Sequence, residues 1–371
     1  MKKAFIVLWI LMPWLLGLAG AVFWSGGRDA PPPDTKEFYL ERPGVAPADN
    51  AFTWFLQATN LYVPTTNHQL IADFLAGQTT GTGELRNWVE QNAECMSLVR
   101  KGTECPACQI PEVESFETTM PYLDLWLNWG KCLAVQAGYA RQAGDFAAAR
   151  EAVLTAERFG NLIQKNAECL IHYLVGVAIV NLALEQTQDL AREPGLPAQD
   201  LQALAASLEA LGPFDAGLVR ALKTECRCSA NLVAQLSAGR TDWLDVFALG
   251  NVQRSFKARA LNHTLRSRYI FQPHKTLGLL QNDYRALIQA VPRIYAQMDL
   301  RDEPKFGQHW TDWVRPNALG QLYRLLMLPA MRHTLKTRCR ADGMLSGAQL
   351  VVAGNRYQRD RGRWPEALAE L

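Results

Sequence analysis

The residues of this sequence that are best suited to chemistry are two cysteines separated by two residues, Cys105 and Cys108. A Cys-x-x-Cys pair can exchange thiols and disulfides when one of its thiolates is acidified at a helix N-terminus. Here Lys101-Gly102 precede the pair and Pro111 follows it, which predicts a loop rather than the strand and helix of a thioredoxin-type site. We therefore expect a local structural disulfide or free loop thiols, and we keep a thiol or redox enzyme as the alternative function.

Residue types that bind metals or act as nucleophiles form no other recognised pattern in the sequence. A second cysteine pair would suggest zinc, but Cys226 and Cys228 are separated by one residue, the wrong spacing for a zinc ligand pair. The six histidines form no His-x-x-x-His pair, and the chain has no Gly-x-Ser-x-Gly, Walker or dinucleotide-binding motif. His172 falls on an apolar helix, where a histidine is more often a hydrogen-bonded core residue than a catalytic base. The sequence thus predicts no metal and no cofactor, and a noncatalytic role is preferred over an enzymatic one.

The elements that must position these residues start with an apolar N-terminal run. Lys2 and Lys3 precede the uncharged, apolar residues 4–24, and no charge appears until Arg28. At about 1.5 Å per residue this run reaches about 30 Å, the thickness of a bilayer's hydrocarbon core. The two lysines predict that residues 1–3 are a cytoplasmic tail and that everything after the anchor lies outside the cytosol. All eight cysteines lie there, where oxidation is available but the pairing is not deducible.

A cleaved signal peptide is the rival interpretation of the same run. Residues 19–21, Ala-Gly-Ala, have the small-x-small form that signal peptidase accepts. We favour the uncleaved anchor because residues 22–24 continue the apolar run and Trp24 suits a membrane interface. Residues 25–48 follow with two glycines and three consecutive prolines, which predicts a stiff spacer between the bilayer and a domain at 49–371.

The charges are distributed unevenly along the chain. Residues 246–371 carry 20 Lys and Arg against 9 Asp and Glu, whereas the rest of the chain carries 18 against 27. The stretches 247–282 and 313–341 contain no carboxylate. One interpretation is that these stretches bind anionic lipid or another polyanion. The other is that they form a solvated face that complements the acidic half of the chain, and we expect this one. Nucleic acid is not an expected partner outside the cytosol.

Helical periodicity dominates residues 49–371, and β-type alternation is nearly absent, so the fold class is predicted to be all-α. Gly144-Asp145 predicts a turn between two antiparallel helices within 120–163. A helix at 167–191 is apolar on nearly every side over 174–184, too short a stretch to cross a membrane, so it should form the centre of the domain. Other helices are predicted at 50–62, 68–76, 85–96, 198–211, 215–237, 243–265, 276–298, 318–336 and 345–360.

Several of these stretches resemble known families. Residues 140–149 resemble the turn of a tetratricopeptide hairpin, without a 34-residue repeat. The stretches 49–51, 108–111, 144–145 with 174–179, and 315–320 with 355–368 resemble a group of uncharacterised, membrane-anchored helical proteins of planctomycetes and related bacteria. The end of the last stretch is also similar to type II secretion pseudopilins, with Gly362 ending one helix and Pro365 opening the next, and Leu368 and Leu371 are expected to turn back onto the core. Relatives continue with a strand-like tail, which implies a truncation or a boundary at Leu371.

Together these features predict a noncatalytic, membrane-tethered helical scaffold or binding module of the bacterial cell envelope. The expected location is the bacterial inner membrane, in a single pass with the N-terminus cytoplasmic and the domain periplasmic. Its expected partners are the lipid bilayer, through residues 4–24, and proteins of the envelope.

Overall fold

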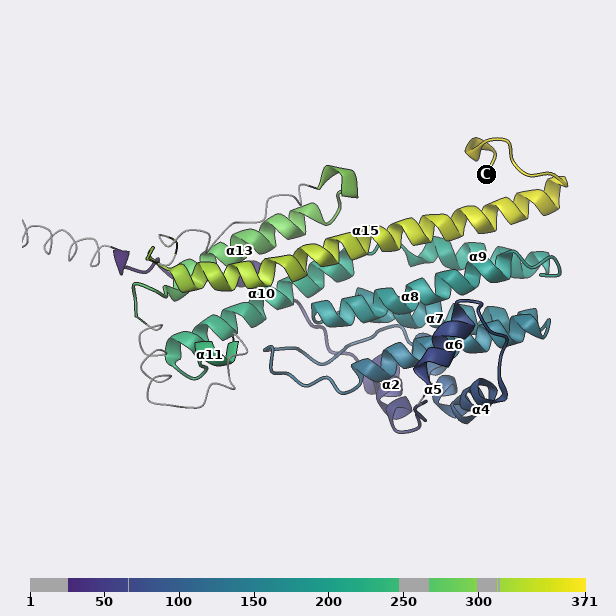
Figure 1. The fold of residues 1–371 in the computed structure, drawn as a ribbon, viewed down its shortest axis with the longest axis horizontal. Helices are drawn as coiled ribbons and strands as arrows, with labels where there is room; N and C mark the ends of the chain where they lie inside the picture. Colours follow the sequence, from purple (N-terminus) through teal and green to yellow (C-terminus); the bar gives the residue numbers. More distant parts are fainter. Residues whose placement is uncertain (1–25, 66, 247–266, 299–311, 313) are drawn as a thin grey trace, which may run out of the picture.

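The computed structural model describes residues 26–65, 67–246, 267–298, 312 and 314–371. Over these ranges the chain is all-α, as the sequence predicts, with about 70% helix and no strand. The predicted tail and anchor at 1–24 lie outside the described residues, and so does most of the helix predicted at 243–265. The helices form an elongated body, with the first described residues near one end and the C-terminus near the other (Figure 1).

The described part of the chain consists of α-helices, four short 3-10 helices and the segments that connect them. The α-helices are α2 (Ala51–Thr59), α3 (His68–Leu75), α4 (Gly83–Gln91), α5 (Ala93–Thr103), α6 (Leu123–Gln142), α7 (Phe146–Lys165), α8 (Leu170–Ala191), α9 (Ala198–Leu211), α10 (Asp215–Ala238), α11 (Trp243–Val246), α13 (Pro273–Ala290) and α15 (Ala318–Arg361). Short 3-10 helices lie at η1 (Lys36–Phe38), η2 (Pro47–Asp49), η3 (Tyr295–Gln297) and η4 (Leu368–Glu370).

Local sequence signals set the turn between α6 and α7. Gly144 has a φ of +76°, a left-handed conformation that glycine adopts without a Cβ penalty. The Oδ1 atom of Asp145 accepts a hydrogen bond from the Ala148 amide at 3.0 Å and so caps α7. The two helices pack against each other and against α8.

Helices α7, α8 and α10 come very close together around Gln164, whose side chain is fully buried. A Cβ atom added to Gly176 of α8 would lie 2.5 Å from the Gln164 backbone nitrogen. A Cβ atom added to Gly217 of α10 would lie 1.9 Å from the Gln164 carbonyl oxygen. Glycine at both positions therefore allows three helices to share one crossing.

Helix α8 lies at the centre of the domain and contacts α6, α7, α10 and α15. Its two flanks belong to different core clusters: Ile179 packs with α5 and α6 residues, and Val180 packs with residues of α9, α10 and α15. Within the described part of the chain it is the one helix long and apolar enough to cross a membrane, and 61% of its apolar window is buried in the fold. A central helix of a water-soluble domain has the same composition, because it is enclosed by apolar neighbours on every side.

The last long helix differs from the sequence prediction. Two helices were expected at 318–336 and 345–360, but α15 continues through the intervening residues and is 44 residues long. The buried residues Leu335, Arg338, Ala341 and Leu345 extend one helical face across the predicted gap. Gly343 in that gap costs about 1 kcal/mol relative to alanine, which tertiary packing of this face outweighs.

Two other boundaries differ from the prediction. The helix expected at 85–96 is divided at Asn92, whose side chain accepts a hydrogen bond from the Val63 amide at 2.9 Å and donates one to the Val63 carbonyl at 3.0 Å. The helix expected at 276–298 ends at Ala290, one residue before Val291-Pro292. Val291 still has a helical backbone, with φ −50° and ψ −49°, but Pro292 has no amide hydrogen to continue the helical hydrogen bonds, so this boundary has a local cause.

Residues 26–48, which are all but the first residue of the predicted spacer, lie against the helical body. Phe38 is buried in the main core cluster. Asp29 accepts hydrogen bonds from the His274 and Lys275 amides at 2.9 and 3.0 Å, at the first turn of α13. Arg42 donates to the Ile110 carbonyl at 2.6 Å. These contacts fix the segment along the domain over much of its length.

A buried carboxyl group makes stability depend on pH. Glu157 of α7 is 1% exposed, and burial raises its pKa to about 7, with one oxygen accepting a hydrogen bond from the Thr187 hydroxyl at 2.7 Å. Its ordinary value is 4.5. The folded state therefore binds the Glu157 proton more tightly than the unfolded state does. The contribution of this proton to the free energy of unfolding is fully present below about pH 4.5 and is lost as the pH rises through 7.

The variant Glu157→Gln keeps the shape of the side chain and removes this titration. We expect it to be more stable than the parent chain at pH 8 by up to about 3 kcal/mol, since one pKa unit corresponds to about 1.4 kcal/mol. At pH 5 the two proteins should be nearly equal. Urea unfolding at both pH values measures the difference, and a gain that is the same at pH 5 and pH 8 would contradict the assignment.

Candidate functional site

The predicted pair Cys105 and Cys108 lies in the loop after α5, as the sequence indicates. Asn50 holds this loop against the start of α2: its Oδ1 accepts from the Gln109 amide at 2.8 Å, and the Ala51 amide donates to the Ala107 carbonyl at 2.8 Å. Cys105 is half-buried and Cys108 is buried, and both are free thiols in this structure.

The surroundings of the pair do not favour a thiolate. Burial raises the pKa of Cys108 to about 12, and it raises the pKa of Cys105 as well. A redox cysteine needs the opposite shift, because the thiolate is the nucleophile. The structure thus offers no support for redox chemistry at this loop. Whether Cys105 and Cys108 form a disulfide stays a prediction.

A second thiol site, at Cys169, was not predicted from the sequence. Cys169 is the residue before α8, and its Sγ lies 3.2 Å from the Nδ1 of His172 and 3.8 Å from the Sδ of Met120. The other ring nitrogen of His172, Nε2, lies 3.1 Å from the hydroxyl of Tyr122. A Cys-x-x-His spacing at a helix start was the one signal that the sequence offered, since positions three apart share a helix face.

The polar atoms of this cluster are buried among apolar neighbours. Cys169 is 3% exposed, His172 0% and Tyr122 8%. Burial lowers the pKa of His172 to about 4 and raises that of Cys169 to about 11. At neutral pH the cluster therefore holds a thiol and a neutral imidazole, consistent with the satisfied core histidine that the sequence predicts.

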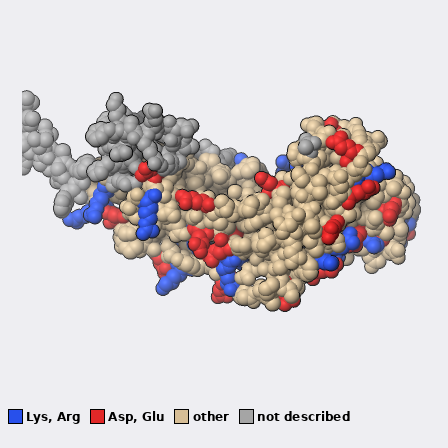
Figure 2. Space-filling view, turned by 90° about the horizontal axis from the view of Figure 1, so that it is seen from below, with Lys and Arg blue, Asp and Glu red and all other residues tan. Residues whose placement is uncertain are grey.

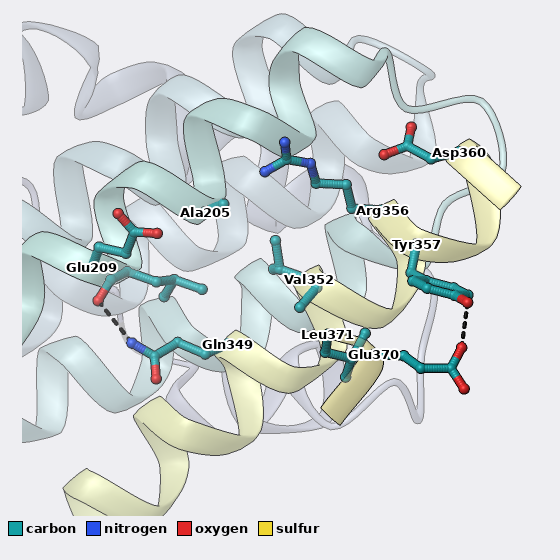
Figure 3. A pocket seen from close by; sticks show the side chains of 11 residues that line it. Ala205, Glu209, Gln349, Val352, Arg356, Tyr357, Asp360, Glu370 and Leu371 are labelled. Atoms are coloured by element: carbon teal, nitrogen blue, oxygen red, sulfur yellow. Dashed lines mark hydrogen bonds between the residues drawn. The ribbon is translucent and has the colours of Figure 1, made fainter. Parts of the chain in front are cut away.

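A groove lies at the far end of the molecule from the first described residues, between α9 and the end of α15 (Figure 3). It encloses about 430 Å³. Figure 3 shows Val352 at its floor, Glu209 on one side, and Tyr357 with Glu370 on the other. The Gln349 amide donates to the Leu208 carbonyl at 3.3 Å and ties the two helices together beside it.

Charged groups line the rim of this groove and apolar groups its floor. The lining includes three carboxylates, Glu209, Asp360 and Glu370, and one guanidinium, Arg356. Glu370 accepts hydrogen bonds from the Tyr357 hydroxyl and from Arg363, which lower its pKa. These groups can bind a cationic side chain, but among the lining residues there is no arrangement of a nucleophile with a base.

The C-terminal segment forms one edge of the groove rather than part of the core. Gly362 ends α15 with a φ of +68°, as the sequence predicts. The expectation that Leu368 and Leu371 turn back onto the core is wrong, because they are 74% and 42% exposed. After Pro365 the segment forms only the 3-10 turn η4, and not the helix that the sequence predicts, so no helical face carries these side chains towards the core.

Two basic residues of the stretch 313–341, Arg324 and Arg338, form ion pairs with acidic residues of other helices. Arg324 forms an ion pair with Asp283 of α13, at 2.7 Å between Nη2 and Oδ1. Arg338 contacts Asp215 of α10 at 2.8 Å and Asp342 at 3.1 Å. Figure 2 shows Lys, Arg, Asp and Glu interspersed over the described part of the face it presents. These pairs agree with internal charge complementation; most of the other basic stretch lies outside the described residues.

Metal sites of the usual protein composition are not present in the described ranges. No three His, Cys, Asp or Glu side chains converge there in a way that could hold an ion. Comparison of the chain with protein-family models, with curated proteins and with solved structures gives no match.

Proposed function

We propose that this chain is a noncatalytic helical scaffold or binding module, tethered to the bacterial inner membrane by residues 4–24 with its domain in the periplasm. The observation that carries the proposal is the position of the groove. It lies at the end of an elongated body opposite to the residues that follow the predicted anchor (Figure 1). A tether at one end leaves such a groove free to meet a partner away from the bilayer.

The construction of the body supports a spacer role. Helix α15 has 44 residues and therefore extends about 66 Å at 1.5 Å per residue. It contacts α8, α9, α10 and α13 along its course. A single helix that packs on several others along its length connects the two ends of the body.

The chemistry of the groove indicates the type of partner. Glu370 is paired with Arg363, so Glu209 and Asp360 against Arg356 leave the rim with a net negative charge, and Val352, Leu208 and Ala205 supply an apolar floor. We infer that the partner is an envelope protein that presents a basic side chain next to an apolar one. Such mixed pockets give specificity by charge and affinity by burial.

The tether is tested by fractionation of cells that express the full chain. We expect the protein in the membrane fraction after high-salt and alkaline washes, and we expect the chain without residues 4–24 to be folded and released from the membrane. Full-length protein that is recovered in the soluble fraction would contradict the proposal.

The groove is tested by photo-crosslinking in intact cells. A photoreactive residue at Glu209, on the rim, should give a discrete adduct, and the same residue at the exposed Gln69 of α3 should not give it. The second change Ala353→Trp, which fills the groove, should remove the adduct, whereas Ala330→Trp on the exposed side of α15 should not. Equal adducts from Glu209 and Gln69, or an adduct that survives Ala353→Trp, would show that the groove is not the contact surface.

A further inference from the structure

The cluster at the start of α8 combines three side chains that bind soft metal ions. The Sγ of Cys169 lies 3.8 Å from the Met120 thioether sulfur and 3.2 Å from the His172 Nδ1 nitrogen. Thiolate, thioether and imidazole are together the ligands that select Cu(I), whereas carboxylates and water suit harder ions. We propose that Cys169, Met120 and His172 form a three-coordinate site for Cu(I).

The two distances from the Cys169 sulfur to the other donor atoms can be compared with those of trigonal coordination. With metal–sulfur and metal–nitrogen bonds of about 2.3 and 2.0 Å, trigonal coordination separates two sulfurs by about 4.0 Å and a sulfur from a nitrogen by about 3.7 Å. The sulfur–sulfur distance of 3.8 Å already meets this value. The sulfur–nitrogen distance of 3.2 Å requires the imidazole to withdraw by roughly 0.5 Å.

The second nitrogen of the imidazole is held in the way that metal-binding histidines require. The Tyr122 hydroxyl lies 3.1 Å from Nε2 of His172. When Nε2 carries the proton and donates it to this hydroxyl, Nδ1 keeps its lone pair on the side of Cys169. Partners of this kind fix the tautomer and the ring orientation of a ligating histidine.

The charge balance of the site favours a monovalent ion. Binding releases the Cys169 thiol proton, so Cu(I) and the thiolate together add no net charge to a site in which Cys169 and His172 are almost fully buried. Two carboxyl groups lie near Cys169: Glu168, which already pairs with Arg42 and Arg220, and Glu225, which accepts a hydrogen bond from the Leu170 amide at 3.0 Å. A divalent ion would need a second negative charge from one of them, whereas Cu(I) needs only the thiolate.

Met120 is the most exposed of the three ligands. Its side chain is half-buried, whereas Cys169 and His172 are buried. A flexible thioether at this position can take up an ion and pass it to the thiolate, because methionine has three rotatable bonds and a polarizable sulfur.

The test is competitive titration of the full chain in detergent with Cu(I), under anaerobic reducing conditions, against a Cu(I)-specific chromophoric chelator. Cys105→Ser with Cys108→Ser serves as the background, because that cysteine pair would bind Cu(I) by itself. We expect one tight equivalent in this background, and X-ray absorption should show two sulfur neighbours and one nitrogen neighbour. This readout is independent of membrane fractionation and crosslinking, so it can fail without affecting the proposed function.

Variants of single ligands separate the site from other thiols. Cys169→Ser should abolish the tight equivalent, whereas Cys226→Ser, at another buried cysteine of α10, should leave it unchanged. Met120→Leu conserves volume, and Tyr122→Phe removes only the hydroxyl; each should weaken Cu(I) binding about tenfold or more. Circular dichroism checks that each variant is folded. The proposal would be overturned if the protein with Cys105→Ser and Cys108→Ser bound no equivalent of Cu(I) tightly. It would also be overturned if tight Cu(I) binding survived Cys169→Ser or were unaffected by Met120→Leu.

Discussion

Replacing Gly217 with alanine is expected to destabilise the protein by about 3 kcal/mol or more, at the upper end of the effect of overpacking. The added methyl group would lie 1.9 Å from the Gln164 carbonyl oxygen, which belongs to the backbone of α7. A side chain cannot rotate away from such a contact, because neither partner is a flexible group. Helix α10 would have to move away from α7 and α8, and the packing of its buried face would be lost.

The matched control is Gly343→Ala in α15. Nothing lies within 4 Å of a Cβ atom at this position, so the substitution should stabilise the protein by about 0.5 to 1 kcal/mol through helix propensity alone. Urea unfolding of both variants at one pH measures the two effects. Equal behaviour of Gly217→Ala and Gly343→Ala would mean that the three-helix crossing is not as close as the structure has it.

Glu168→Ala is expected to cost about 3 kcal/mol, in the range found when one partner of a buried ion pair is removed. The Glu168 side chain is 1% exposed and pairs with Arg42, at 3.2 Å, and with Arg220 of α10. Arg42 belongs to the segment before α2, so this carboxylate joins the N-terminal segment to α10 at the start of α8. Its removal leaves two guanidinium groups close together without the charge between them.

Two further variants distinguish this network from ordinary surface pairs. Asp189→Ala removes the acid of an exposed pair with Arg192, whose side chains are 40% and 55% exposed, and should change stability by less than about 0.5 kcal/mol. Glu168→Gln keeps the shape and loses the charge, and should fall between the parent and Glu168→Ala. Thermal unfolding of the parent and the three variants ranks their stabilities. A loss of stability in Glu168→Ala as small as that in Asp189→Ala would contradict the network.

Much of the helical framework follows from local sequence signals. Gly144 and Asp145 end one helix and cap the next, and Gly362 ends the last one, because these residues act on the backbone within one turn. The central position of the helix at 167–191 also follows from its composition, since an all-round apolar surface must be covered. The membrane anchor at 4–24 and the resemblance to envelope proteins are likewise sequence predictions, and they stay so because the described residues do not include the anchor.

Tertiary contacts determined what local signals could not. The spacing of Gly176 and Gly217 along their helices gives no sign of a shared crossing, because the partner of both is Gln164, a residue on a third helix. Residues 337–344 appear in sequence as a break, yet they remain helical where Arg338 and Ala341 are buried against other helices. The Cys169 cluster depends on Met120 and Tyr122, about fifty residues earlier in the chain. Caps and apolar stripes are properties of neighbouring residues, whereas close approach, burial and donor geometry arise only when distant segments are brought together.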